Sequence, residues 1–167
     1  LIQETNNTIG AVFFLMSEDN VRQQHKLPWM SFCSDAAAVA TEGDVLKQGA
    51  HPPAYGNFAR LLGHNVRDEQ IIPLEEAIFK LSSLTARILK IKHRGLLADG
   101  YFADVVVFDP DTITDHATFA EPHQLSTGMV HVFVNGEQVL KDGQHTGAMP
   151  GRVVRGPGYK VNADDQP

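Results

Sequence analysis

Two continuous apolar runs near the start of the chain predict two strands with a helix between them. The runs are IGAVFFLM at residues 9–16 and WMSFC at residues 29–33. A strand-length run without polar alternation is typical of a strand buried on both faces of a parallel sheet. Between the runs, Ser17 can cap a helix with two acids in its first turn, and Pro28 predicts its end by residue 27. The order strand, helix, strand indicates a βαβ unit.

Helical periodicity dominates the middle of the chain. A helix is predicted to start near Asn57, with apolar residues on one face at Phe58, Leu61, Leu62 and Val66. A second, stronger stripe runs from Pro73 to Ile88 with Glu75 and Glu76 in its first turn, and it should end before Gly95.

The last third of the chain carries antiparallel β patterns. Residues 103–109 (ADVVVFD) are β-branched, and residues 129–134 alternate toward Asn135-Gly136, a strong hairpin signal. Residues 137–140 then return toward Asp142-Gly143. The change from an α/β part to a β part therefore falls near residues 90–100.

Composition and charge narrow the possible functions. A formal charge of −6 over 167 residues argues against nucleic-acid binding and against an acidic membrane surface as partner. The single cysteine, Cys33, excludes an internal disulfide and a multi-cysteine zinc site, and it is expected to be a small buried hydrophobe. No apolar stretch approaches the roughly 18 residues of a membrane span. The start at Leu1, without Met or a leader pattern, indicates a fragment or a processed product. It leaves cytoplasmic, periplasmic and secreted locations open.

Asp35 is the first candidate for chemistry, because active sites collect at the carboxyl ends of parallel strands. A carboxylate there can be a metal ligand or a general base, although Asp is also common in caps and turns. His51 lies in the long loop after Asp35 and is a second candidate, with an ordinary polar loop residue as the alternative. His123 is a weaker candidate of the same kind.

Other motifs of catalysis or binding are missing from the sequence. The eight histidines show no HxH or HExxH spacing, and there is no GxSxG elbow and no glycine-rich phosphate loop. Lys90, Lys92, His93 and Arg94 form a basic cluster at the end of the predicted helix, where they complement the helix dipole.

Four ordered stretches together resemble a known family. They are HPPAYGNFARLLG (51–63), GLLADGYFADVVVFDP (95–110), DPDTITDHATFAEPHQ (109–124) and VNGEQVLKDGQHTGAMPGR (134–152). The stretch at 95–110 alone would match dihydroorotases, hydantoinases and imidazolonepropionases nearly as well. With the others, and with Ser34-Asp35 after a short strand, the chain resembles the C-terminal part of an N-acyl-D-amino-acid deacylase from about residue 9 to 155. This is the D-aminoacylase family of the amidohydrolase superfamily.

The resemblance implies a zinc-dependent hydrolase with a (β/α)₈ barrel flanked by a β-sandwich. The expected fold class is α/β plus β: residues 1–95 would be the last part of the barrel, 96–155 part of the sandwich and 156–167 a tail. Residues 9–16 would form barrel strand seven and residues 30–33 strand eight, each followed by helices. Asp35 then matches the family's aspartate after strand eight, which touches the metal region and acts as the general base.

The chain departs from the family pattern in two ways. The early barrel strands that supply the histidine and bridging ligands of one or two zinc ions are absent, and Cys33 does not occupy the family's cysteine position. The family's His-Pro-Arg, whose arginine would pair with a substrate carboxylate, is replaced by His51-Pro52-Pro53. Arg60, Lys47 or a residue outside this chain could substitute, or the substrate could differ from an ordinary N-acyl-D-amino acid. His51, Tyr55 and Arg60 are the candidate substrate-binding residues.

The leading hypothesis is therefore a piece of a zinc hydrolase that converts an N-acyl-D-amino acid to a D-amino acid and a carboxylate. Alone, the chain should be inactive, because a catalytic zinc normally needs three protein ligands. One alternative is a non-catalytic assembly or binding module, and another is an amidohydrolase acting on cyclic amides or dipeptides. The expected partners are a small amide and either a second copy or the missing barrel half, because two barrel strands alone expose unpaired edges.

Overall fold

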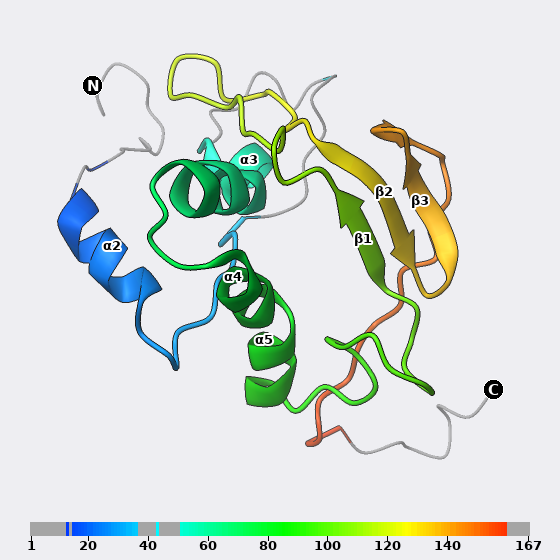
Figure 1. Cartoon of the computed structure of the whole chain (residues 1–167). Coiled ribbons are helices and arrows are strands. Elements are labelled where there is room, and N and C mark those ends of the chain that lie inside the picture. The colour runs from blue at the N-terminus through cyan, green and yellow to red at the C-terminus, as the bar shows by residue number, and fades with distance from the viewer. Residues whose placement is uncertain (1–12, 14, 37–42, 44–50, 160–167) are drawn as a thin grey trace, which may run out of the picture.

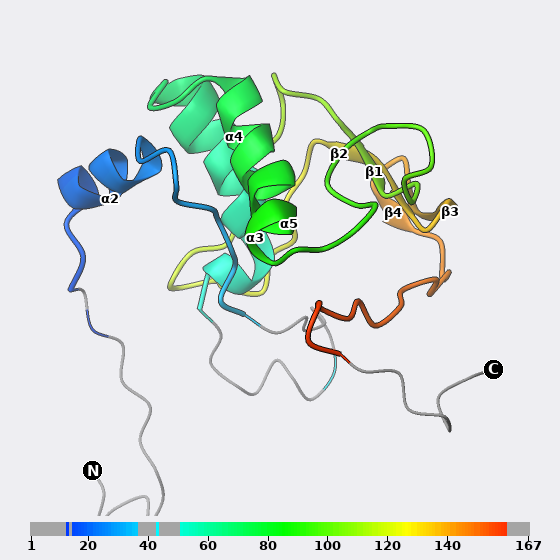
Figure 2. The ribbon, with the colours of Figure 1, turned by 90° about the horizontal axis from the view of Figure 1, so that it is seen from below.

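The computed structural model describes residues 13, 15–36, 43 and 51–159, in which a group of helices packs beside a small sheet (Figures 1 and 2). The helices are α2 (Glu18–His25), α3 (Pro53–Arg60), a π-helix (Leu61–Asp68), α4 (Leu74–Leu81) and α5 (Ser83–Ile88). The strands are β1 (Val105–Phe108), β2 (Met129–Val134), β3 (Glu137–Lys141) and β4 (Gln144–His145). Of the helices described, none has the length and apolar character needed to cross a membrane.

Helix α2 has the predicted bounds. Ser17 is its N-cap in extended conformation, Glu18 and Asp19 lie in the first turn, and the helix ends at His25, before Pro28. Acids near the N-terminus interact favourably with the partial positive charge of the helix. The sequence signals at both ends are confirmed.

The predicted strands on either side of α2 are not seen among the described residues. Most of residues 9–16 lies outside the described part, and Leu15 and Met16 belong to no strand. Residues 30–33, expected as a strand, pair with no described residue. Trp29 is 69% exposed, and Cys33 is exposed rather than buried. An apolar run becomes a strand only where a neighbour accepts and donates its hydrogen bonds, and the described residues offer none here.

Helix α3 begins earlier than predicted, at Pro53, and continues directly into the π-helix. Proline suits the first helical turn, because its missing N–H would have no partner there. Leu61, Leu62 and Val66 are buried as their spacing predicts, whereas Phe58 is 46% exposed.

The stripe predicted from Pro73 to Ile88 is divided into α4 and α5 at Ser82, whose backbone angles are φ −123° and ψ −75°. Lys80 at the end of α4 is only 1% exposed, although lysine is seldom buried. Its ammonium group donates to Glu76 Oε1 at 2.7 Å and to the His25 carbonyl oxygen. The buried charge is therefore paired, and it ties α4 to the end of α2.

The predicted antiparallel sheet is confirmed as a meander in the order β1-β2-β3-β4. The turn from β2 to β3 is Asn135-Gly136, with φ of 52° and 85°. The turn from β3 to β4 is Asp142-Gly143, with φ of 50° and 76°. Two consecutive positive φ angles are typical of the type I′ turn, whose twist matches the strands.

Ile113 joins the helices to the sheet. Its side chain is 1% exposed in a core that also contains α3, π-helix and α4 residues. A Cβ atom on Gly63 would lie 2.3 Å from the Ile113 carbonyl oxygen, and one on Gly128 would lie 2.3 Å from the Ile113 Cα. Arg67 Nη1 donates to the same carbonyl at 2.7 Å. We call this arrangement of Gly63, Arg67, Ile113 and Gly128 the Ile113 clamp.

A network of polar side chains lies at the other end of the sheet, where β1 begins and β2 ends. The Arg94 guanidinium contacts Asp104 and donates to Asn135 Oδ1 at 2.6 Å. Asp104 also accepts the Asn135 backbone N–H at 2.9 Å, and the Asn135 amide donates to the Pro150 carbonyl at 2.7 Å. Burial alone would raise the pKa of Asp104, but the Asn135 N–H and the Arg94 guanidinium outweigh it and hold that pKa below its ordinary value.

Replacing Gly63 by Ala is expected to destabilise the fold by about 1–3 kcal/mol, because the added methyl meets rigid backbone. Urea unfolding followed by circular dichroism measures the change. Gly151→Ala is the matched control: a Cβ there meets nothing within 4 Å, so its effect should stay within about 0.5 kcal/mol. Equal stability of the two variants would contradict the clamp.

The Asp104 network predicts a specific acid response. Because the pKa of Asp104 is lower in the folded chain than in the unfolded one, its stabilisation is complete above the unfolded pKa and is lost as the pH falls through the folded one. Asp104→Asn should therefore flatten the dependence of the unfolding free energy on pH as the pH falls below about 5. Asp99→Asn is the control, since Asp99 is exposed and its side chain makes no ion pair or hydrogen bond with a described residue. An equally steep profile in Asp104→Asn would exclude this role.

Candidate functional site

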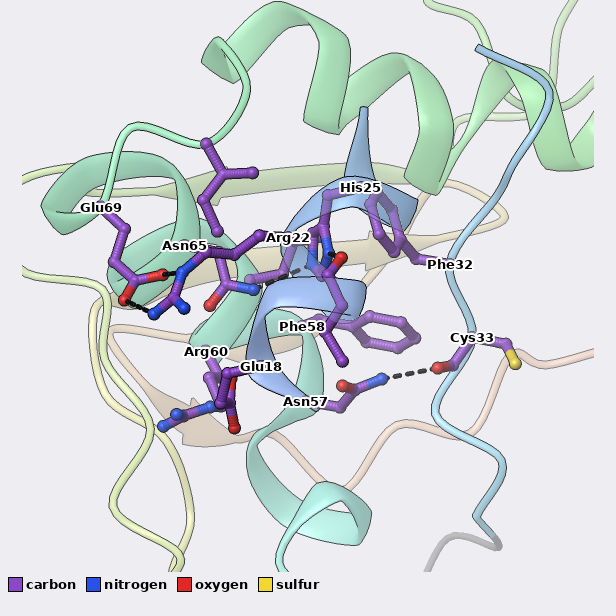
Figure 3. A pocket seen from close by; sticks show the side chains of 13 residues that line it. Glu18, Arg22, His25, Phe32, Cys33, Asn57, Phe58, Arg60, Asn65 and Glu69 are labelled. Carbon is purple, nitrogen blue, oxygen red and sulfur yellow. Dashed lines mark hydrogen bonds and ion pairs between the residues drawn. The ribbon is translucent and has the colours of Figure 1, made fainter. Parts of the chain in front are cut away.

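The segment that carries Asp35 is attached to α3 by one hydrogen bond. The Asn57 amide of α3 donates to the Cys33 carbonyl oxygen at 2.6 Å, two residues before Asp35 (Figure 3). Asp35 itself is exposed, and its φ of 50° places it in the left-handed region, where Asp is tolerated better than most residues. Asn57 thus fixes the chain from which the candidate carboxylate projects.

A cavity of about 270 Å³ lies between α2, residues 32–33 and α3 (Figure 3). The Arg22 guanidinium binds Glu69 at one end of it, with Nη2 donating to Oε1 at 2.7 Å. This hydrogen bond and the charge of Arg22 hold the pKa of Glu69 below its ordinary value. The buried His25 ring lies within hydrogen-bonding distance of the Asn65 amide at 2.9 Å and of the Val21 carbonyl at 2.6 Å. Because these side chains already bind one another, we interpret this cavity as part of the packing of α2 against the neighbouring helices and not as a ligand site.

A second cavity, of about 400 Å³, adjoins the first, with which it shares Glu18, Asn57 and Arg60. It contains two of the predicted residues, His51 and Arg60. Asp115 lines its far wall, with Oδ2 3.6 Å from Arg60 Nη1. Asp115 can lie this close to α3 because residue 56 is glycine: a Cβ on Gly56 would lie 2.6 Å from the Asp115 Cβ. The Arg60 side chain remains 52% exposed, so it can meet a second anion while it faces Asp115.

Two aromatic contacts hold residues 117–124 against the start of α3. The His51 ring meets Phe119 edge to face at a centroid distance of 5.3 Å, and the Tyr55 ring meets His123 at 5.5 Å. The Nε2 atom of His123 is buried and has no hydrogen-bond partner among the described residues. The structure therefore places Tyr55 with His123 and not in the cavity that His51 and Arg60 share.

The structure brings together only part of the predicted site. Asp35 lines neither cavity at α3, and Lys47 lies outside the described residues. Sequence reasoning missed Asn57 and Asp115, although both lie inside the stretches that carry the family resemblance. Their roles depend on partners distant in sequence, and no local pattern indicates such partners.

The described residues hold no group of three or more His, Cys, Asp or Glu side chains that could bind a metal ion. Asp35 alone supplies one ligand, and a catalytic zinc site normally has three protein ligands. By themselves, the described residues do not fit a zinc site.

Comparison with known proteins gives a consistent result. Residues 13–140 match a family model described as the amidohydrolase family. The chain is 38% identical over 145 residues to a D-aminoacylase of Alcaligenes xylosoxydans xylosoxydans, and 40% identical over 146 residues to an N-acyl-D-aspartate deacylase of the same organism. Each match covers 87% of this chain and 28% of the relative, so the chain spans less than a third of these proteins.

Two solved structures are similar to this chain. One is a D-aminoacylase with a binuclear metal centre, described as showing one-metal activation and second-metal attenuation; the TM-score is 0.70 and the identity 36%, over 85% of this chain and 28% of that one. The other is an N-acyl-D-glutamate deacylase of Bordetella bronchiseptica with zinc and a phosphonate mimic of the tetrahedral intermediate; the TM-score is 0.66 and the identity 37%, over 78% and 27%.

Proposed function

Because the chain belongs to the amidohydrolase family, we propose that it forms the C-terminal part of a zinc-dependent hydrolase that cleaves the linear amide of an N-acyl-D-amino acid. The observation that carries the proposal is the 38–40% identity to D-aminoacylase and N-acyl-D-aspartate deacylase over 87% of the chain. Family membership confirms the resemblance drawn from the ordered motifs.

The proposed domain division is residues 1–95 for the last part of a barrel, 96–155 for part of a β-sandwich and 156–167 for a tail. The change from helices, which end at Ile88, to strands, which begin at Val105, supports this boundary. The two parts share one core around Ile113, which indicates that they pack as an obligate interface. Residues 9–16 and 30–33 would become paired strands once the remaining barrel strands lie beside them.

Asp35 is the proposed general base. A carboxylate can accept a proton from the attacking water as its oxygen adds to the acyl carbonyl carbon. The same proton then passes to the amide nitrogen as the C–N bond breaks, which releases a carboxylate and a D-amino acid. The exposure of Asp35 and the anchoring of its segment by Asn57 are compatible with a group that meets substrate at the mouth of a barrel.

One or two zinc ions would polarise the acyl carbonyl in the complete enzyme. Asp35 is the only residue of this chain proposed as a ligand, and the others would come from the rest of the barrel. The solved relative with zinc and the one with a binuclear metal centre support the expectation of one or two metal ions in the complete enzyme. The isolated chain should then be inactive and should associate either with itself or with the remainder of the barrel.

Arg60 is the proposed partner of the substrate carboxylate, with His51 beside it. Position 53, where the family usually has arginine, is the first residue of α3 and is proline. Arg60 is the cation that shares the 400 Å³ cavity with His51, and half of its side chain is exposed. Tyr55 would act indirectly, through His123 and the loop that closes this cavity.

Asp35→Asn in the complete protein should reduce kcat on N-acetyl-D-amino acids by about 10²–10⁴-fold, the usual contribution of a general base. Release of the free amine measures turnover, with zinc supplied. Asp99→Asn, which removes a carboxylate from an exposed loop, is the matched control and should keep full activity. Undiminished turnover in Asp35→Asn would remove Asp35 from the mechanism.

Arg60→Gln should raise KM by about tenfold with a smaller effect on kcat, because a charge-assisted hydrogen bond to the substrate carboxylate is lost. N-acetyl-D-alanine and its uncharged amide are the substrates to compare, and the difference between them should disappear in the variant. Arg87→Gln on the exposed side of α5 is the control. A KM that does not change would exclude Arg60 and assign the carboxylate to another cation, either Lys47 or one outside this chain.

A non-catalytic assembly module remains the competing proposal, motivated by the incomplete ligand set among the described residues. Inactivity of the complete protein on N-acyl-D-amino acids, cyclic amides and dipeptides alike would favour it. Activity on cyclic amides or dipeptides alone would keep the enzyme class and change the substrate.

A further inference from the structure

A cavity of about 480 Å³ lies between the turn that follows α5 and the C-terminal segment. Five basic side chains line it: Lys90, Lys92, Arg94, Arg152 and Arg155. The orange-to-red segment passes below α5 in Figure 1, so two parts of the chain about 60 residues apart form its walls. It shares no lining residue with the two cavities at α3.

The charge at this cavity is opposite to that of the chain. The sequence carries a formal charge of −6 and only 14 lysine and arginine residues, yet five of these line one cavity. No aspartate or glutamate is among its described lining residues. Cations gathered around a concave surface raise the local concentration of anions.

The two arginines nearest to aromatic rings are held in place before any ligand binds. The Arg94 guanidinium stacks over Phe102 at 4.1 Å from the ring centroid, and Arg155 stacks over Tyr159 at 3.8 Å. Stacking occupies the face of a guanidinium and leaves its edge to donate in the plane, as bidentate recognition of phosphate requires. The edge of Arg155 donates to no described residue, whereas the edge of Arg94 already donates to Asp104 and Asn135.

The remaining cations have no hydrogen-bonding or charged partner within residues 51–159 and the other described parts of the chain. The side chains of Lys90, Lys92 and Arg152 make no ion pair or hydrogen bond with any described residue, whereas Arg94 is engaged by Asp104. Four positive charges at the cavity are therefore uncompensated by described residues. A monoanionic carboxylate would leave most of their mutual repulsion in place, whereas a group with two or more charges would remove it.

The backbone supports a role for the Lys90 charge. Lys90 follows the C-cap of α5 with φ 54°, and the N–H of Ile91 closes the helix by donating to the Ala86 carbonyl at 2.8 Å. Glycine is the usual residue at such a left-handed position, because a Cβ is strained there. The chain thus holds a lysine where helix termination alone would favour glycine.

We propose that this cavity binds a diphosphate group, either as free pyrophosphate or as part of a nucleoside diphosphate. The charge of a diphosphate matches the four uncompensated cations, and its oxygens suit the in-plane donors of the stacked Arg155 guanidinium. The site is independent of the proposed hydrolase chemistry, because it uses none of the residues assigned to it.

Isothermal titration calorimetry of the complete protein with sodium pyrophosphate, at constant ionic strength, tests the proposal. Pyrophosphate should bind at least about tenfold more tightly than inorganic phosphate, because a second phosphoryl group adds charge-assisted hydrogen bonds. Acetate should give no measurable binding. Adenosine diphosphate distinguishes the two sources: tighter binding than pyrophosphate assigns a nucleotide, and equal or weaker binding assigns the free anion.

Lys90→Gly is the decisive variant, because it removes the charge and relieves the left-handed strain at once. It should weaken pyrophosphate binding by about tenfold while the thermal midpoint stays equal to that of the parent or rises. Arg152→Gln should weaken binding similarly. Lys141→Gln on β3 makes the same change of charge away from the cavity and should leave Kd within about twofold.

Three results would overturn the proposal. They are no binding of pyrophosphate at millimolar concentration, equal affinity for phosphate and pyrophosphate, and an equal loss of affinity in Lys141→Gln and Lys90→Gly. The last would show that the basic residues act only through the general field of the protein.

Discussion

The contact of Ile113 with two glycines is the constraint on which the rest of the structure depends. It allows backbone from the loop between β1 and β2 to lie directly against the π-helix, where no side chain would fit. The Arg67 guanidinium then donates a hydrogen bond to the Ile113 carbonyl oxygen of that backbone. Because Asp115 follows two residues later, the clamp also determines where the wall of the Arg60 cavity lies. The Ile113 clamp therefore determines both the packing of the core and the geometry of the Arg60 cavity.

Different kinds of interaction stabilise the two ends of the sheet. At the clamp, apolar burial and close backbone approach dominate, and they are insensitive to salt and pH. At the opposite end, Asp104 connects Arg94, Asn135 and the start of the C-terminal segment through charged hydrogen bonds that acid removes. Arg94 belongs to both this network and the basic cavity, so the position of that cavity depends on the charged end of the sheet.

Sequence reasoning succeeded where structure is decided locally. The cap at Ser17, the proline limits and the Asn135-Gly136 and Asp142-Gly143 turns are fixed by the conformational preferences of a few adjacent residues. It failed at residues 30–33 and at Cys33, because a strand and its burial depend on neighbours that the described residues do not supply. It also treated Lys90 and Lys92 as complements of a helix dipole. Only the fold brings Arg152 and Arg155 beside them.

The two-residue turns have a consequence for the order of folding. Strands β2, β3 and β4 pair through contacts between residues close in sequence, so little chain entropy is lost before those hydrogen bonds form. The pairing of β1 with β2, and the clamp with Gly63, close much longer loops. We expect the hairpins to form first and the helix–sheet contact last, so that the Arg60 cavity belongs to the final cooperative step, which φ-values at Val139 and Ile113 would resolve.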